Sequence, residues 1–324
     1  GGYHGPRRLN WVIGLALLLG VLVANFSGYL LPWDKLSYWA ITISTAMMNY
    51  VPWIGEWLQM LARGGSEISN ITLIGFFTIH TTVVPAALLV VMAWHFWRVR
   101  KAGGVVIPRA EGQVLEEKPE KTLFIPNLFT REVAVACALT ALIVVISVVF
   151  SAPLGPEANP GMSPNPAKAP WYFLGFQELL LHFHPVLAVV VIPLAALFFL
   201  ALLPYIHHRD GIDGVWMISV AGRRSGLVAL IFGLVVTPIL IIADDLRPGA
   251  ADLSAGVGGF VPLLIVAAVA AGFVFFLRRS LGAPKEETLQ AFVLLLMTAL
   301  AVLTITGVWF RGEGMALVWP WMVP

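Results

Sequence analysis

Stretches of mostly apolar residues recur along this chain and alternate with polar segments. A helix needs about 20 apolar residues to cross a hydrocarbon core of about 30 Å. Each stretch therefore predicts a transmembrane helix, at residues 11–31, 73–97, 133–150, 173–203, 226–243, 260–277 and 289–309. The fourth stretch is longer than a bilayer requires, so we expect part of it to tilt or to lie outside the hydrocarbon core. The pattern predicts an all-α integral membrane protein with about seven transmembrane helices.

The composition supports this class. Of 324 residues, 59% are hydrophobic and 12% charged, and the formal net charge is +2. A soluble domain carries about twice that share of charge. These values argue against a soluble, disordered or nucleic-acid-binding protein. A single cysteine, Cys137, excludes a disulfide framework, a cysteine-ligated iron–sulfur cluster and a CxxCH haem attachment within the chain.

The basic residues are distributed unevenly between the two predicted membrane sides. Segments on the side of Gly1, here termed the n side, carry fifteen of the twenty lysines and arginines, and the opposite p side carries five. The positive-inside rule places the n side in the cytoplasm. We therefore expect a multi-pass protein of a bacterial cytoplasmic membrane, with a cytoplasmic N-terminus and a C-terminus on the p side.

Two polar connections divide the chain. Residues 106–131 form a charged n-side linker, and residues 151–170 form a p-side segment with six prolines. Proline at this density is incompatible with a regular helix or strand, so this segment, here termed the lid, is expected to lie on the membrane surface. We divide the chain into residues 1–105, the linker 106–131, residues 132–250 with three spans, and residues 251–324 with two further spans and a p-side tail.

Two histidines mark the second predicted span. His80 and His95 are fifteen residues apart, which separates them by about 22 Å along one side of a helix. Ionisable residues inside a membrane are costly and usually functional, and neutral imidazole is a common haem ligand. Spacing alone leaves two interpretations open, namely haem ligation and hydrogen bonding across a helix bundle. His182 and His184 point apart on a helix, which favours an interfacial position over metal binding.

Several ordered motifs resemble one family. They are Gly28-Tyr-Leu-Leu-Pro-Trp-Asp-Lys-Leu-Ser-Tyr-Trp-Ala40, Phe76-Phe-Thr-Ile-His80 with His95, Leu154-Gly-Pro-Glu-Ala-Asn-Pro160 and Ala169-Pro-Trp-Tyr-Phe173. In this order they resemble cytochrome b of quinol:cytochrome c oxidoreductases, particularly the chloroplast type with a separate subunit IV. The resemblance runs from Gly1 to about Ala243. The chain looks like a cytochrome b without the first two helices, fused to a subunit IV-like half, with two additional spans.

The resemblance implies two b-type haems. His80 would ligate the iron of the p-side haem and His95 that of the n-side haem. Arg98 follows the ligating helix and is a candidate partner for a haem propionate, and the alternative for it is the positive-inside belt and helix capping. The second histidine of each haem lies, in the family, two helices earlier. We expect those helices in a companion chain or a further segment, and the chain is expected to be inactive alone.

The resemblance also implies two quinone sites. Menaquinone is a candidate quinone because the family's p-side glutamate is missing here and the predicted orientation is bacterial. Tyr38 and Trp39 would flank the p-side quinol site on one side, and Trp171 and Tyr172 on the other. The family motif Pro-Glu-Trp-Tyr reads Ala169-Pro170-Trp171-Tyr172 here, so the usual glutamate is missing.

Glu178 is the candidate replacement for that acid. Apolar neighbours are expected to raise its pKa and suit it to accept a quinol proton. The alternative is an ion pair with a cation of a partner subunit. On the n side, Arg131 and Glu132 match the position of the family's quinone-site pair, and the alternative for them is helix capping and the positive-inside belt.

The implied function is that of a cytochrome b subunit in a respiratory quinol oxidoreductase complex. On the family's pattern, such a subunit would oxidise quinol on the p side, pass electrons through two haems across the membrane and contribute to proton translocation. The implied partners are a Rieske-type iron–sulfur protein, a c-type cytochrome or both, in a dimeric complex. The alternative is a haem-containing membrane anchor of a dehydrogenase with a single quinone site.

Overall fold

A computed structural model describes residues 5, 7–105, 123–152, 154–206, 215–246 and 260–322. Within these ranges the regular structure is helical, and the only β-type pairings are two isolated bridges, Asp34 with Glu157 and Arg311 with Leu317. Seven helical segments in this part of the chain are long and apolar enough to cross a membrane. The predicted all-α membrane fold is confirmed. Residues 106–122 of the predicted linker lie outside the described residues, and the four-part division of the chain stays a prediction.

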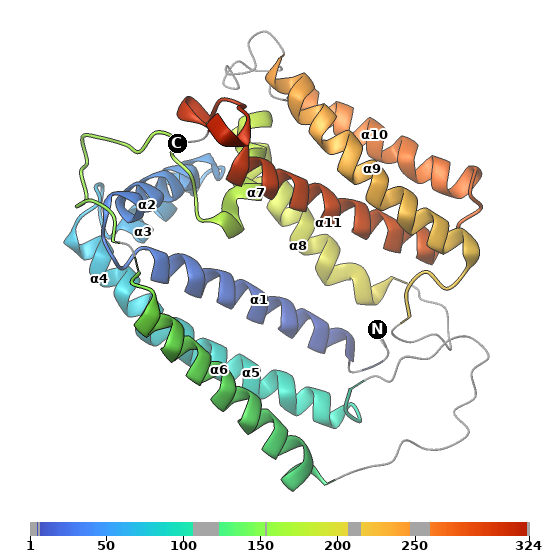
Figure 1. Cartoon of the computed structure of the whole chain (residues 1–324), viewed down its shortest axis with the longest axis horizontal. Coiled ribbons are helices and arrows are strands. Elements are labelled where there is room, and N and C mark those ends of the chain that lie inside the picture. The colour runs from blue at the N-terminus through green and yellow to red at the C-terminus, as the bar shows by residue number, and fades with distance from the viewer. Residues whose placement is uncertain are drawn as a thin grey trace.

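The first part of the chain contains two spans joined by short helices at one end of the molecule (Figure 1). Its elements are α1 (Arg7–Tyr29), α2 (Lys35–Met47), η1 (Met48–Tyr50), α3 (Gly55–Arg63), α4 (Asn70–Thr78), the π-helical turn η2 (Ile79–Val83) and α5 (Val84–Lys101). The segment α4–η2–α5 is one continuous span, and it packs against α1.

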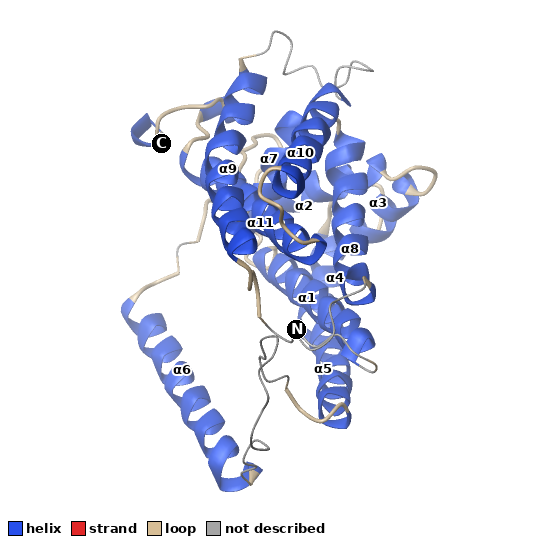
Figure 2. Cartoon of the chain, turned by 90° about the vertical axis from the view of Figure 1, so that its right-hand side faces the viewer, coloured by secondary structure: helices blue, strands red, loops and turns tan. Residues whose placement is uncertain are grey.

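The second part of the chain provides the remaining five spans. Its elements are η3 (Phe124–Leu128), α6 (Phe129–Val149), α7 (Trp171–His182), η4 (Leu187–Val191), α8 (Ile192–Leu202), η5 (Leu203–Tyr205), α9 (Val220–Asp245), α10 (Val261–Arg279), α11 (Lys285–Trp309), η7 (Glu313–Met315) and η8 (Pro320–Met322). Helix α6 contains no buried residue and stands apart from the other helices in Figure 2.

The predicted fourth span, 173–203, divides into two helices. Helix α7 ends at His182, and Phe183 is extended, with φ −120° and ψ 153°. The break has a local cause, because Pro185 follows His184 and a residue before proline is disfavoured in helical conformation. Only the second piece, Leu187–Tyr205, is long enough to span. The span boundaries therefore differ from the predicted 173–203, and the expectation that part of this stretch tilts or lies outside the hydrocarbon core stays a prediction.

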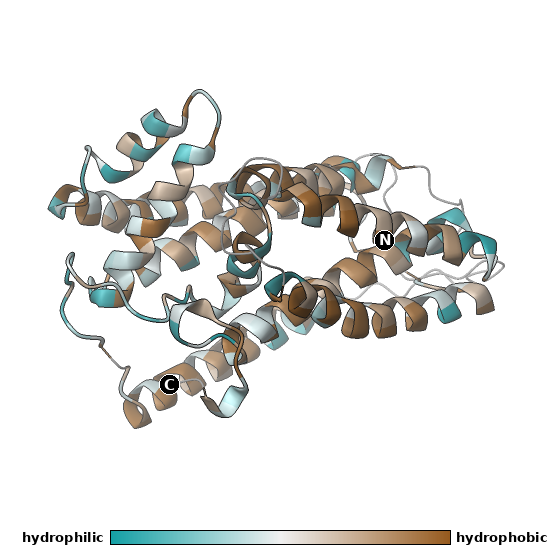
Figure 3. Cartoon of the chain, turned by 90° about the horizontal axis from the view of Figure 1, so that it is seen from above, coloured by the Kyte–Doolittle hydropathy of each residue, from teal (hydrophilic) through white to brown (hydrophobic). Residues whose placement is uncertain are grey.

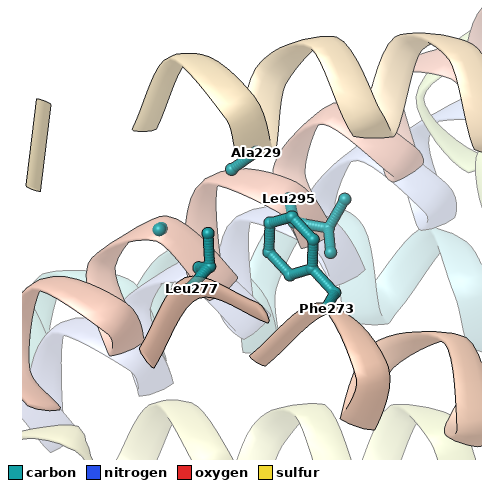
Figure 4. Packing of buried hydrophobic residues seen from close by; sticks show 5 residues of the cluster. Ala229, Phe273, Leu277 and Leu295 are labelled. Atoms are coloured by element: carbon teal, nitrogen blue, oxygen red, sulfur yellow. The ribbon is translucent and has the colours of Figure 1, made fainter. Parts of the chain in front are cut away.

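Apolar side chains of helices α9, α10 and α11 pack against one another. Ala229, Phe273, Leu277 and Leu295 form a buried cluster between them (Figure 4). Most other large apolar side chains are exposed. The brown, apolar colour predominates along the long helices in Figure 3. This pattern is typical of a protein whose solvent is lipid.

Contacts between distant segments connect the helices at both ends of the bundle. At the end where α1 begins, Arg7 donates to the carbonyl oxygens of Ala102 and Gly104, and the Trp11 indole donates to the Leu200 carbonyl at 2.7 Å. At the other end, the lid contacts α2. Segments that the sequence assigns to one membrane side therefore meet at one end of the molecule.

We predict that Gly233→Leu destabilises the protein by about 1–3 kcal/mol, because the side chain has no room there. A Cβ at Gly233 would lie 2.8 Å from Thr298 Cγ2, where α9 packs on α11. Gly272→Leu is the matched control, since a Cβ on α10 there meets nothing within 4 Å. Thermal unfolding of the purified protein in detergent measures both. Equal midpoints for the two variants would contradict the close α9–α11 contact.

Candidate functional site

His80 lies in the π-helical turn η2, where its ring is fixed by α1. Its Nδ1 is 3.1 Å from the Ala24 carbonyl oxygen and 3.1 Å from Ser27 Oγ. When Nδ1 donates to that carbonyl, Nε2 keeps a free lone pair, which is the state in which imidazole binds a metal. Pro85 follows the turn and lacks the N–H of a regular helical bond, which accounts for the local irregularity.

His95 lies further along the same span, on α5. Its ring is half-buried, and its Nδ1 is buried without a hydrogen-bond partner among the described residues. A buried polar atom without a partner is uncommon in proteins and requires an explanation. A ligand that binds an imidazole nitrogen is one such explanation.

Glycines on α1 face the two histidines. A Cβ at Gly28 would lie 2.6 Å from His80 Cε1, and a Cβ at Gly14 would lie 3.4 Å from His95 Cε1. Between them, a Cβ at Gly20 would lie 2.7 Å from Leu88 Cδ2. Small residues allow membrane helices to approach closely. Two imidazoles, each with a nitrogen free of hydrogen bonds and each against a glycine, fit the haem ligation that the resemblance implies.

Of the three n-side candidates, Arg98 lies near His95 and the Arg131–Glu132 pair does not. Arg98 is half-buried in the last turn of α5, three residues beyond His95. Arg131 and Glu132 lie in the exposed first turn of α6, which contributes no buried residue. The described structure does not place this pair beside His95.

On the p side, aromatic rings connect the helix of His80 with α7. Phe26 on α1 makes edge-on contacts with Phe76 at 6.1 Å and with Phe173 at 6.0 Å between ring centroids. Phe76 is one turn before His80. The hydroxyl of Tyr172 donates to the Asn25 carbonyl at 3.3 Å. The first residues of α7 therefore lie close to the helix end that carries His80.

The other candidate aromatics are on α2, beneath the lid. Tyr38 makes edge-on contacts with Trp33 and Trp39, and the Trp39 indole donates to the Asn159 carbonyl of the lid at 3.0 Å. Trp171 is 69% exposed and packs edge-on against Tyr172. The structure thus places both pairs at the p-side end.

Asp34 fixes the start of the lid. Its carboxylate caps α2 by accepting from the Ser37 N–H at 2.9 Å, and it accepts from the Gly155 N–H of the lid at 3.0 Å. Burial raises the pKa of Asp34, but the hydrogen bonds from Ser37 and Gly155 outweigh it and leave the pKa below its ordinary value. The Lys35 N–H adds a bond to the Pro156 carbonyl at 2.8 Å. The lid is therefore bound to α2 through backbone and carboxylate together.

Glu178 is not the unpaired acid that its apolar neighbours suggest. It is 1% exposed and accepts from Arg311 Nε at 2.9 Å and from His182 Nε2 at 3.3 Å. Burial raises the pKa of Glu178, but the hydrogen bonds from His182 and Arg311 lower it by more than burial raises it. The pKa of Glu178 therefore lies below its ordinary value. The expected raised pKa is wrong. Its cation belongs to this chain and not to a partner subunit.

Sequence reasoning missed the rest of this cluster. His182, predicted to be interfacial, is 6% exposed, and its Nδ1 lies 2.8 Å from Asp244 Oδ2. Burial lowers the pKa of His182, but its bonds with Glu178 and Asp244 raise it above the ordinary value. One signal was available, since Glu178 and His182 are four residues apart and share a helix face. His184 instead stacks on Phe260 at 5.2 Å.

Comparisons with known proteins agree with these features. A family model described as cytochrome b (N-terminal)/b6/petB matches residues 1–166. Cytochrome b/c1 of Bradyrhizobium diazoefficiens is 27% identical over 320 residues, covering 85% of this chain and 45% of the relative. Cytochrome b of Cereibacter sphaeroides is 30% identical over 190 residues, covering 56% and 42%. Cytochrome b6 of Porphyra purpurea is 44% identical over 105 residues, covering 32% and 48%.

The chain spans less than half the length of these relatives. Among solved structures, a chain of "Hyperthermophilic respiratory Complex III" superposes with a TM-score of 0.57 at 22% identity, covering 92% of this chain and 72% of that one. This likeness concerns the fold.

We predict that Asp34→Ala loosens the lid and costs about 1–2 kcal/mol of stability, because it removes a helix cap and a bond to Gly155 together. Hydrogen exchange of the peptide that contains residues 155–161 measures the local effect. Because the pKa of Asp34 is lowered by folding, its contribution is present at neutral pH and is lost as the pH falls through the folded-state value. Glu157→Gln is the control, and equal protection in both variants would argue against the clamp.

Proposed function

Because the chain belongs to the cytochrome b N-terminal/b6 family, we propose that it acts as the cytochrome b subunit of a respiratory quinol oxidoreductase complex. The observation that carries the proposal is the placement of His80 and His95 at opposite ends of one span, each against a glycine of α1. The proposed setting is a bacterial cytoplasmic membrane, with the N-terminus in the cytoplasm and the C-terminus on the p side.

His80 and His95 would each supply one axial ligand to a b haem. Haem supplies one-electron transfer when it is bound. Ala24 and Ser27 orient the His80 ring, and Arg98 is the candidate partner for a propionate. Among the described residues the only other histidines are His182, the last residue of α7, and His184 just beyond it. We therefore propose that the second ligands come from helices outside this sequence, in the same polypeptide or in a companion chain.

The p-side quinol site would lie between α2 and α7, beneath the lid. Tyr38, Trp39, Trp171 and Tyr172 are its candidate walls. Glu178 remains the candidate proton acceptor. Its lowered pKa keeps it ionised at neutral pH, and its bond from Arg311 must weaken when a proton arrives. A proline lid held on α2 favours a dedicated quinol site over the single-site membrane anchor of a dehydrogenase.

The other parts of the proposal come from the family resemblance. Arg131 and Glu132 would contribute to quinone reduction on the n side. This role requires that α6, which has no buried residue here, packs against other helices of the complex. Menaquinone is the proposed quinone for a different reason, namely the missing glutamate of the p-side motif together with the predicted bacterial orientation. A Rieske-type iron–sulfur protein, a c-type cytochrome or both would accept electrons, in a dimeric complex, and proton release on the p side would contribute to proton translocation.

Quinol-driven reduction of haem in the purified complex tests this function. We expect added menaquinol to reduce b haem, as followed by the absorbance of the α-band. Tyr172→Ala is expected to slow that reduction about tenfold or more, because a misplaced wall disturbs the geometry of the reactants. Haem that menaquinol and ubiquinol both fail to reduce would overturn the proposal.

A separate prediction concerns the haem ligand. Gly28→Val is expected to displace the ring of His80, because a Cβ there would already lie 2.6 Å from Cε1, and to remove the p-side b haem while the n-side haem stays bound. Gly75→Val, on α4 near His80, is the matched control because its Cβ meets nothing within 4 Å. Reduced-minus-oxidised spectra measure the haem content. Full content in both variants would show that this contact does not hold a ligand.

A further inference from the structure

The segment after the last helix reaches into the p-side end of the molecule. Arg311, two residues beyond α11, is 1% exposed. Its Nε donates to Glu178 at 2.9 Å, and its Nη1 donates to Asp245 Oδ1 at the end of α9 at 3.0 Å. The same Nη1 donates to the Met315 carbonyl at 3.0 Å. One guanidinium therefore joins α7, α9 and the C-terminal segment.

The charges of this cluster are matched. Its positive side chains are Arg311, Lys168 and His182, and its negative side chains are Glu178, Asp244 and Asp245. The raised pKa of His182 favours the protonated imidazole. An unpaired charge at Arg311 or Glu178, each 1% exposed, would be strongly unfavourable, whereas a matched set with hydrogen bonds is tolerated. The position of Arg311 is therefore determined by several partners at once.

The same C-terminal segment also holds the end of the lid. Lys168 Nζ donates to the Val308 carbonyl in the last turn of α11 at 3.0 Å, and the Gly314 N–H donates to Asn165 Oδ1 at 2.6 Å. On α7, Gln177 accepts from the Ala169 N–H and donates to the Ala167 carbonyl. The lid is thus attached to α2 at its start and to α7, α11 and the tail at its end.

Helix α7 also packs closely against α11. A Cβ at Gly175 would lie 2.6 Å from Thr304 Oγ1, and a Cβ at Gly307 would lie 3.0 Å from Leu174 Cβ. These contacts leave little room for α7 to slide along α11. Trp171 and Tyr172 form the first turn of this same α7, so their position follows that of the helix.

We propose that Arg311 is a positioning residue of the p-side quinol site, which acts through Glu178 to fix α7, the end of the lid and the Trp171–Tyr172 wall. The inference rests on the proposed quinol oxidation at this site. It assigns a role in that site to the segment after α11, which lies outside the matched residues 1–166.

The test compares Arg311→Met with Glu178→Gln, the double variant and a control at the opposite end of the same helices. Glu287 is a buried carboxylate on α11 that accepts from the Ser219 N–H and hydroxyl at the start of α9. Glu287→Gln therefore loosens the α9–α11 pair without touching the p-side cluster. Each variant is prepared as the full complex, and the haem spectrum, the kcat and KM for menaquinol and the hydrogen exchange of residues 165–182 are measured.

We expect Arg311→Met to lower kcat/KM about tenfold or more, with a raised KM, faster exchange of residues 165–182 and an unchanged haem spectrum. In the Glu178→Gln background the same change is expected to cost less than about twofold, because coupled residues are not additive. Arg311→Lys, which keeps the charge but loses the planar fork, is expected to recover part of the loss, and it serves as the test variant if Arg311→Met does not assemble.

Three results would overturn the inference. They are unchanged kinetics in the Arg311 variants, full additivity with Glu178→Gln, or an equal loss in Glu287→Gln. A wild-type complex that does not oxidise quinol would instead reject the proposed function.

Discussion

The p-side end of this protein depends on how one buried carboxylate is neutralised. Glu178 is 1% exposed, so its charge requires a cation within hydrogen-bonding distance. Arg311 supplies that cation from the far end of the chain, and His182 supplies a second hydrogen bond. The pairing ties α7 to α9 and to the C-terminal segment. The lid and the aromatic residues at the start of α7 are then held in place by elements that are themselves fixed.

A second constraint acts within the first two spans. The bilayer sets the length of a helix, and a separation of fifteen residues puts His80 and His95 near its opposite ends. Glycines on α1 then decide how closely the two helices approach. A hydrogen bond orients the ring of His80, whereas the Nδ1 of His95 has no partner among the described residues. The fifteen-residue separation of His80 and His95, together with these surroundings, therefore supports the electron-transfer role proposed for the chain.

The sequence predicts features that depend on local pattern and misses those that depend on distant partners. The seven spans follow from runs of apolar residues, and the p-side lid follows from proline. The apolar neighbours of Glu178 predict a raised pKa. They cannot show that its partner is Arg311, 133 residues away, so the predicted direction of its pKa shift is wrong. The clamp of Asp34 on Gly155 escapes sequence reasoning for the same reason.

The central claim is that His80 and His95 each hold a b haem. The most direct measurement is the pyridine haemochrome content per copy of this chain, in a complex purified with all its subunits and identified by mass spectrometry. We predict two b haems per copy, together with a further segment or chain that carries the second pair of histidines. A complete complex without b haem would contradict it and leave the two histidines as packing residues.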